Sequence, residues 1–222
     1  MRGLLAIFVG SILACAALPA QTSPPSVQAT GNSTISVTPD QVQLSVSVIT
    51  QGANAQEAGQ LNAAQANTVQ SALKAILGTN GTIQTVGYSV YPRYNTNGTT
   101  IIGYTASNTI QVTTTNLGII GSVIDTANQA GASSVSGLTF GLQNPDPVLQ
   151  QALTAATKQA LGHIAAIATG LGVKTGSIIS ASESTSYAPA VLGSAPTASS
   201  TPISSGTVGV SATVTVSAAI SQ

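Results

Sequence analysis

Very few side chains in this sequence could carry acid–base or metal chemistry. The chain holds one histidine, His163, one cysteine, Cys15, and five acidic residues. No Asp, Glu or Cys stands within a helical turn of His163, whereas metal sites combine several such ligands at recognisable spacing. We therefore expect a structural role for His163, and the sequence predicts no metal site and no cofactor.

Two carboxylates, Asp40 and Asp125, are candidates for a general acid–base pair if the fold brings them together. The interpretation that we favour places Asp40 in a turn after Pro39 and Asp125 on a helix surface. No serine stands in the Gly-x-Ser-x-Gly pattern of hydrolase nucleophiles. Residues 170–175 lack the Gly before Lys that a phosphate loop requires, so we expect Gly172 to end a helix. The sequence thus predicts no catalytic and no cofactor-binding residue.

Composition excludes several classes of protein. Five basic and five acidic side chains make up 5% of the chain and cancel in net charge, against ~25% charged residues in typical domains. A neutral chain lacks the basic surface of a nucleic-acid binder. Apolar residues make up 43%, which is enough to bury a core, so a disordered chain is not expected. Scarce titratable groups favour assembly or binding over acid–base catalysis.

The first 20 residues have the pattern of a signal peptide. Arg2 precedes small and apolar residues from 4 to 14, a run shorter than the ~20 residues of a membrane-spanning helix. Leu18-Pro19-Ala20 fits a cleavage site before Gln21. The alternative is a lipoprotein anchored through Cys15, because the residues before it faintly match a lipobox. We expect a periplasmic or secreted protein with no membrane span in the mature chain.

The rest of the chain predicts an α+β fold. It is expected to consist of two βαββ pseudo-repeats with a linking helix, in which long helices pack on mixed β-sheets. The expected parts are a signal peptide (1–20), a flexible leader (21–33) and a domain over 34–219, made of a first unit (34–115), a linking helix (116–131) and a second unit (132–219).

In the first unit, apolar and polar residues alternate from Ile35 to Val48 and predict one long half-buried strand, whose phase shifts at Pro39-Asp40. Asn54 and Glu57 form a capping box that opens a helix. Two strands follow, joined by a turn at residues 95–98. The returning strand places the even-numbered residues of 102–112 on one apolar face.

In the second unit, alternating Leu138, Phe140 and Leu142 predict the first strand. Asp146 is expected to cap the following helix, with Pro147 at its first position. A strand near residue 177 comes next, and the last strand covers residues 208–216 with its even-numbered side chains buried.

One long segment, residues 188–206, shows no periodicity and is rich in Pro and Ser. Loops of this length are usually functional or disordered. Its apolar residues Val191, Leu192 and Ile203 suit an arm that docks on a neighbouring subunit, and the alternative is a disordered connector.

An ordered set of residues across positions 29–219 resembles the SIMPL-domain family, whose bacterial members are YggE-like periplasmic proteins of unknown function. The residues that carry this resemblance are Gly31, Pro39-Asp40, Tyr88, Pro92, Tyr94, Tyr104-Thr105-Ala106-Ser107-Asn108, Ile124-Asp125, Gly131-Ala132, Phe140, Leu171-Gly172-Val173 and the stretch from Val210 to Val216.

The resemblance implies a place in the cell envelope, a role in stress tolerance and, for some members, ring-like oligomers; it implies no agreed catalytic residues. The chain departs from the family in charge, since Gln, Thr and Ala stand where family helices carry Lys, Arg and Glu. We therefore expect an exported, non-enzymatic envelope protein that acts by self-assembly or by binding an envelope partner, in envelope or oxidative stress tolerance. The alternative is a small-molecule binder or hydrolase that uses a cleft between the two repeats.

Overall fold

A computed structural model describes residues 24–188 and 203–222, so the segment expected to be a signal peptide, Cys15, Val191 and Leu192 lie outside the described residues. The elements, in chain order, are β1 (Ser26–Val37), β2 (Gln41–Gly52), α1 (Ala55–Leu77), β3 (Gly81–Tyr94), β4 (Ile101–Thr114), a short 3-10 helix (Leu117–Ile119), α2 (Ile120–Gln129), β5 (Ser134–Gly141), α3 (Asp146–Leu171), β6 (Lys174–Ala188) and β7 (Val208–Ser221).

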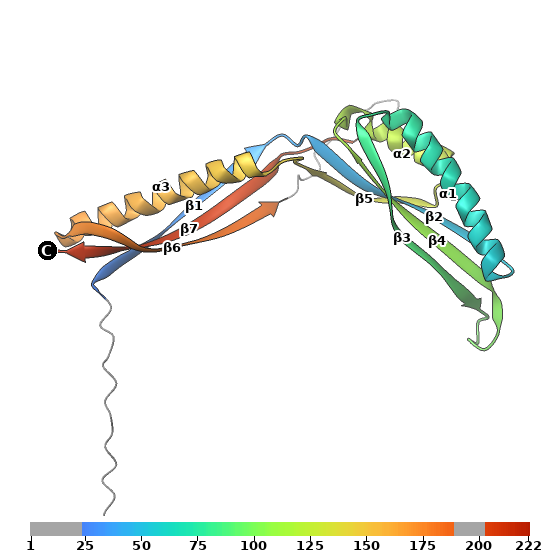
Figure 1. Ribbon diagram of the computed structural model, residues 1–222, viewed down its shortest axis with the longest axis horizontal. Coiled ribbons are helices and arrows are strands. Elements are labelled where there is room, and N and C mark those ends of the chain that lie inside the picture. The colour runs from blue at the N-terminus through green and yellow to red at the C-terminus, as the bar shows by residue number, and fades with distance from the viewer. Residues whose placement is uncertain (1–23, 189–202) are drawn as a thin grey trace, which may run out of the picture.

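The strands form two sheets, and each is covered on one face by helices. One sheet has the order β3-β4-β2-β5 and carries α1 and α2, and the other has the order β1-β7-β6 and carries α3. Figure 1 shows the two helix-on-sheet layers joined end to end in an elongated, bent molecule, with α1 and α3 on the outer side of the bend. The α+β class expected from the sequence is confirmed.

The two layers share one connectivity. In the first, β2, α1, β3 and β4 form a βαββ unit in which β4 lies between β2 and β3. In the second, β1, α3, β6 and β7 repeat this plan, with β7 between β1 and β6. The whole first layer, with α2 and β5, is therefore inserted between the first strand and the helix of the second layer.

This insertion corrects two expectations at the start of the chain. The alternation from Ile35 to Val48 is not one strand but β1 and β2, which separate at residues 38–40 and enter different sheets. Most of the expected leader, from Ser26 onward, belongs to β1. Its inward residues Val27, Ala29 and Gly31 are small, so their weak alternation gains its stability from pairing with β7 and from cover by α3.

Two further expectations about the sheets were wrong. The strand around Phe140 pairs with β2 and so joins the first layer, while β1 supplies the first strand of the second. The sheets are also not mixed: every pairing among the described strands is antiparallel. The helix crossovers do make β2 parallel in direction to β3, but β4 fits between them and pairs antiparallel with both.

The core follows the predicted faces of the strands. In β7 the even-numbered residues from Val208 to Ala218 are buried. In β4 the prediction holds for Ala106, Ile110 and Val112, which are buried, but is wrong for Ile102, which is 56% exposed. Each layer has its own apolar cluster, since large side chains of α1 and the first sheet form one and the alanines of α3 with β1 and β7 form the other.

The residues predicted to begin and end the helices do so in the structure, with one difference at the start of α3. Asn54 Oδ1 accepts a hydrogen bond from the Glu57 N–H at 2.9 Å, which is half of the expected capping box. Gly172 ends α3 in the left-handed conformation, as expected. Asp146 is the first residue of α3 rather than its cap, and its N–H donates to Asn144 Oδ1.

At Ile203, the expectation of an arm that docks on a neighbouring subunit is wrong. It is partly buried and packs against the core of the first layer of its own chain, so it is not free to reach a neighbour.

Candidate functional site

The candidate residues that the sequence raised have structural partners. His163 lies on α3, where its Nδ1 is 3.1 Å from the carbonyl oxygen of Thr30 on β1. Asp40 lies between β1 and β2, and its Oδ1 accepts a hydrogen bond from the Gln143 N–H at 2.7 Å. Asp40 is thus the turn residue that the sequence favoured, and it fastens the passage into β2 to the passage out of β5.

The remaining candidates also lie in structural positions. Asp125 is in α2 and Gly172 is the C-cap of α3. Across residues 24–188 and 203–222, no group of three or more His, Cys, Asp or Glu side chains is placed to hold a metal ion.

The junction between the two layers is where separate parts of the chain meet. The chain crosses it at residues 38–40 and again at residues 142–145. The Asp40 N–H donates to the Gly141 carbonyl at 3.1 Å, which ties the two crossings together. Tyr187, near the end of β6, accepts a hydrogen bond from the Leu142 N–H at 2.8 Å. The second layer therefore touches the crossing segment through a phenol hydroxyl.

A cavity of about 290 Å³ opens at this junction. It is lined by the start of β2, the end of β5, the crossing segment and Tyr187. The described lining residues are Gln41, Gln43, Thr139, Phe140, Gly141, Leu142, Pro145 and Tyr187. None of them is Asp, Glu, Lys, Arg or His. The cavity offers carboxamide, hydroxyl and apolar groups, but no acid–base pair.

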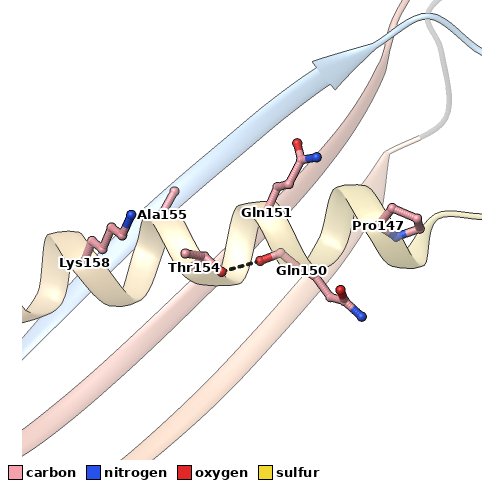
Figure 2. Close-up of a pocket in the computed structure, with 6 residues that line it drawn as sticks. All are labelled: Pro147, Gln150, Gln151, Thr154, Ala155 and Lys158. Atoms are coloured by element: carbon pink, nitrogen blue, oxygen red, sulfur yellow. Dashed lines mark hydrogen bonds between the residues drawn. The ribbon is translucent and has the colours of Figure 1, made fainter.

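Two other hollows are less suited to a ligand. The larger, about 570 Å³, has described lining from α3 alone, and Figure 2 shows its side chains, with Lys158 as the charged one, spread along that single helix. A hollow of about 220 Å³ lies where the ends of β3 and β4 meet Gln41 and Gln143. Of the three, the junction cavity alone has described lining from both layers.

The edges of the sheets differ sharply in how they are covered. On β1, the Asn32 N–H donates to Gln159 of α3, and His163 of α3 contacts the Thr30 carbonyl. These two helix side chains occupy backbone groups of an edge strand, which would otherwise be open to another strand.

The β6 edge has no such cover among the described elements. β6 pairs only with β7, all 15 of its residues are exposed, and α3 lies mainly over β1 and β7. The edge strand β3 of the first layer also exposes apolar side chains, among them Val86, Tyr88 and Tyr91.

Sequence reasoning missed the residues that organise these sites. Tyr187 gave no signal because its partner, Leu142, is 45 positions away. Gln159 looked like an ordinary polar helix residue. Asn62 is fully buried on α1, where its Nδ2 donates to the carbonyl oxygens of Val48 at 2.9 Å and Ala106 at 3.2 Å. A polar residue on an otherwise apolar helix face was the one available hint for Asn62.

The comparisons with known proteins assign no activity. The SIMPL family, described as "Protein of unknown function (DUF541)", matches residues 27–218. A 26 kDa periplasmic immunogenic protein of Brucella melitensis is 27% identical over 169 residues, which cover 73% of this chain and 68% of that protein. The protein of the same description from Brucella abortus matches to the same extent.

No helix in the described parts of the chain is long and apolar enough to cross a membrane.

The residues that the family match covers decide the assignment. The match begins at the second residue of β1 and ends at residue 218 within β7, so it includes both layers. The chain belongs to the SIMPL family.

Proposed function

We propose that this is an exported, non-enzymatic protein of the cell envelope that acts by self-assembly or by binding an envelope partner. The observation that carries the proposal is the contrast between sheet edges. Gln159 and His163 contact the backbone of β1 at Asn32 and Thr30, whereas β6 presents 15 exposed residues along a strand that pairs on one side only among the described elements. A long uncovered edge strand is a template for pairing with a strand of another chain.

The surface of β6 supports the same proposal. Ile178 and Ile179 are 52% and 48% exposed, and Lys174 and Glu183 are its only charged residues. Natural edge strands that avoid pairing are usually short or heavily charged. With a net charge of zero, little repulsion keeps two subunits apart.

Molar mass in solution tests the assembly. We expect the chain from Gln21 onward to be an oligomer by size-exclusion chromatography with light scattering. Lysines in place of both isoleucines (Ile178→Lys with Ile179→Lys) should lower that mass, because they put charge on the edge. The matched control is Leu61→Lys, an equally exposed apolar residue on α1 of the other layer, and it should leave the mass unchanged.

The outcomes of this experiment separate the alternatives. If the wild-type protein is a monomer at every concentration, self-assembly is excluded and partner binding is the remaining alternative. An equal loss of mass in the control would show a non-specific effect of charge. Replacing residues 189–202 with a short Gly/Ser turn extends the test to the loop, which contributes to assembly if the mass falls.

Export is part of the proposal and is supported by the Brucella relatives, which are named as periplasmic proteins. We propose that residues 1–20 are removed. N-terminal sequencing of the protein from its native host should then begin at or near Gln21. A chain that begins at a lipidated Cys15 would place the protein on a membrane surface instead.

A second candidate function, small-molecule binding, is favoured by the junction cavity, because that cavity has walls from both layers.

A further inference from the structure

The junction cavity has the size and shape of a small ligand site. Its volume of about 290 Å³ is at the lower end of the ~300–1,000 Å³ found for ligand pockets. That room suits one small ring and is too little for a nucleotide or an extended peptide. The walls come from both layers of the fold, so a bound molecule would touch both of them.

The lining defines the charge of the ligand. The described walls hold no acidic, basic or histidine side chain. Asp40, which precedes the lining residue Gln41 in the chain, accepts a hydrogen bond from the Gln143 N–H. A charged ligand would lose its hydration there without gaining an ionic partner. A neutral molecule has no such cost.

The lining also defines the functional groups of the ligand. Gln43 on β2 pairs directly opposite Thr139 on β5, and Gln41 pairs opposite Gly141. Directly opposite residues of an antiparallel pair lie on the same face of the sheet, so a carboxamide and a hydroxyl stand side by side. Carboxamides donate and accept hydrogen bonds. The Thr139 hydroxyl donates to the Gly137 carbonyl at 3.3 Å, so it offers its oxygen as an acceptor. Together these groups match a ligand that carries hydroxyl and amide groups.

Tyr187 completes this wall from the second layer. Its hydroxyl oxygen accepts the Leu142 N–H at 2.8 Å, so its hydrogen is left to donate to another group. Its side chain is 43% exposed, and aromatic rings with one polar tip suit ligands that have both apolar and hydroxyl-bearing sides.

We propose that the junction cavity binds a neutral, hydroxyl-rich small molecule of the size of one sugar ring, held by Gln41, Gln43, Thr139 and Tyr187. This proposal rests on the second candidate function, small-molecule binding. The site shares only Tyr187 with β6, and the observations that support it are independent of assembly.

N-acetylglucosamine is a suitable probe, because it is neutral and carries both hydroxyls and an acetamide. We expect its titration into the ¹⁵N-labelled mature protein to shift the amide signals of Leu142 and the side-chain amide signals of Gln41 and Gln43. N-acetylglucosamine 6-phosphate has the same ring with a charged group, and it should bind at least about tenfold more weakly.

Two conservative variants locate the site. Thr139→Val and Tyr187→Phe each remove one hydroxyl and keep the shape, so each should weaken binding about fivefold, the loss of one hydrogen bond. The control, Tyr104→Phe, removes a phenol hydroxyl near the opposite end of β2, where Tyr104 pairs with Gly52, and should bind as the wild type does. Unchanged signals outside the junction show that each variant is folded.

Each contrary result would overturn the proposal. Absence of any shift at the junction excludes a sugar-like ligand there. Equal binding of the phosphorylated sugar would contradict the inference that the ligand is neutral. Signal shifts confined to another surface would place the binding site there.

Discussion

At the scale of single residues, small side chains decide how closely α3 approaches its sheet. The inward stripe of α3 consists mainly of alanines, including Ala152, Ala156 and Ala160, which are fully buried. A Cβ atom on Gly31 of β1 would stand 2.0 Å from the Ala156 carbonyl oxygen and 2.6 Å from the Ala160 nitrogen. Gly31 is therefore required for this close contact, which gives a physical reason for one residue of the family resemblance.

Gly31→Ala should destabilise the protein by about 3 kcal/mol, at the upper end of overpacking effects. The added methyl group meets helix backbone, which cannot turn aside as a side chain can. Urea unfolding should show a lower midpoint with an unchanged slope.

The matched control is Gly162→Ala on α3, where an added Cβ meets nothing within 4 Å. This change should stabilise the protein by up to about 1 kcal/mol, since alanine is the better helix former. If both variants unfolded at the wild-type midpoint, the close approach of α3 to β1 would be wrong.

At the scale of elements, local signals predicted the helices and most strands, because caps and periodicity are properties of neighbouring residues. Asn54 marks the start of α1, Gly172 ends α3, and even-numbered residues of β7 are buried. These features need no knowledge of the rest of the chain.

Strand partners were not predictable in the same way. The residues on both sides of Pro39-Asp40 alternate alike, and nothing local says that they enter different sheets. The pairing of β1 with β7 joins segments about 180 positions apart, as Thr30 with Thr215 illustrates. The local alternation sets which side chains face the core, but not which distant strand is the partner. The junction cavity could not be predicted from the sequence for the same reason, since its walls come from β2, β5 and β6.

The contacts that α3 side chains make with the edge strand β1 could not be predicted from the sequence, for a related reason. Gln159 and His163 stand four positions apart on α3, one turn of the helix, and both contact the backbone of β1. The spacing is visible in the sequence, but the strand that they reach is not. The lone histidine thus helps to cover a sheet edge, a role that neither metal nor acid–base chemistry would suggest.

At the scale of the whole molecule, an inserted layer needs firm connections, because both crossings pass through the same junction. Asp40 accepts the Gln143 N–H and the Asp40 N–H donates to Gly141, so one crossing is fastened to the other. Tyr187 adds the contact from β6, and Ile203 packs on the core of the first layer from the far side of the loop. Among the described residues, these contacts connect the two layers, and each layer has its own apolar cluster.

Gly141→Ala should weaken this connection without unfolding either layer. An added Cβ would stand 2.8 Å from the Tyr187 hydroxyl, which is the far end of a flexible side chain and can move away at little cost. Tyr187 would then release the Leu142 N–H. We expect a nearly unchanged thermal midpoint, faster hydrogen exchange at Leu142, and a broader distance distribution in small-angle scattering as the bend loosens. The control is Gly87→Ala, whose Cβ would make only ordinary contacts with Thr109 at 3.7 Å and beyond. It should change neither exchange nor scattering. Unaltered exchange at Leu142 in Gly141→Ala would mean that Tyr187 does not hold the crossing segment. Of the contacts described between the layers, those of Asp40 and Ile203 would then remain.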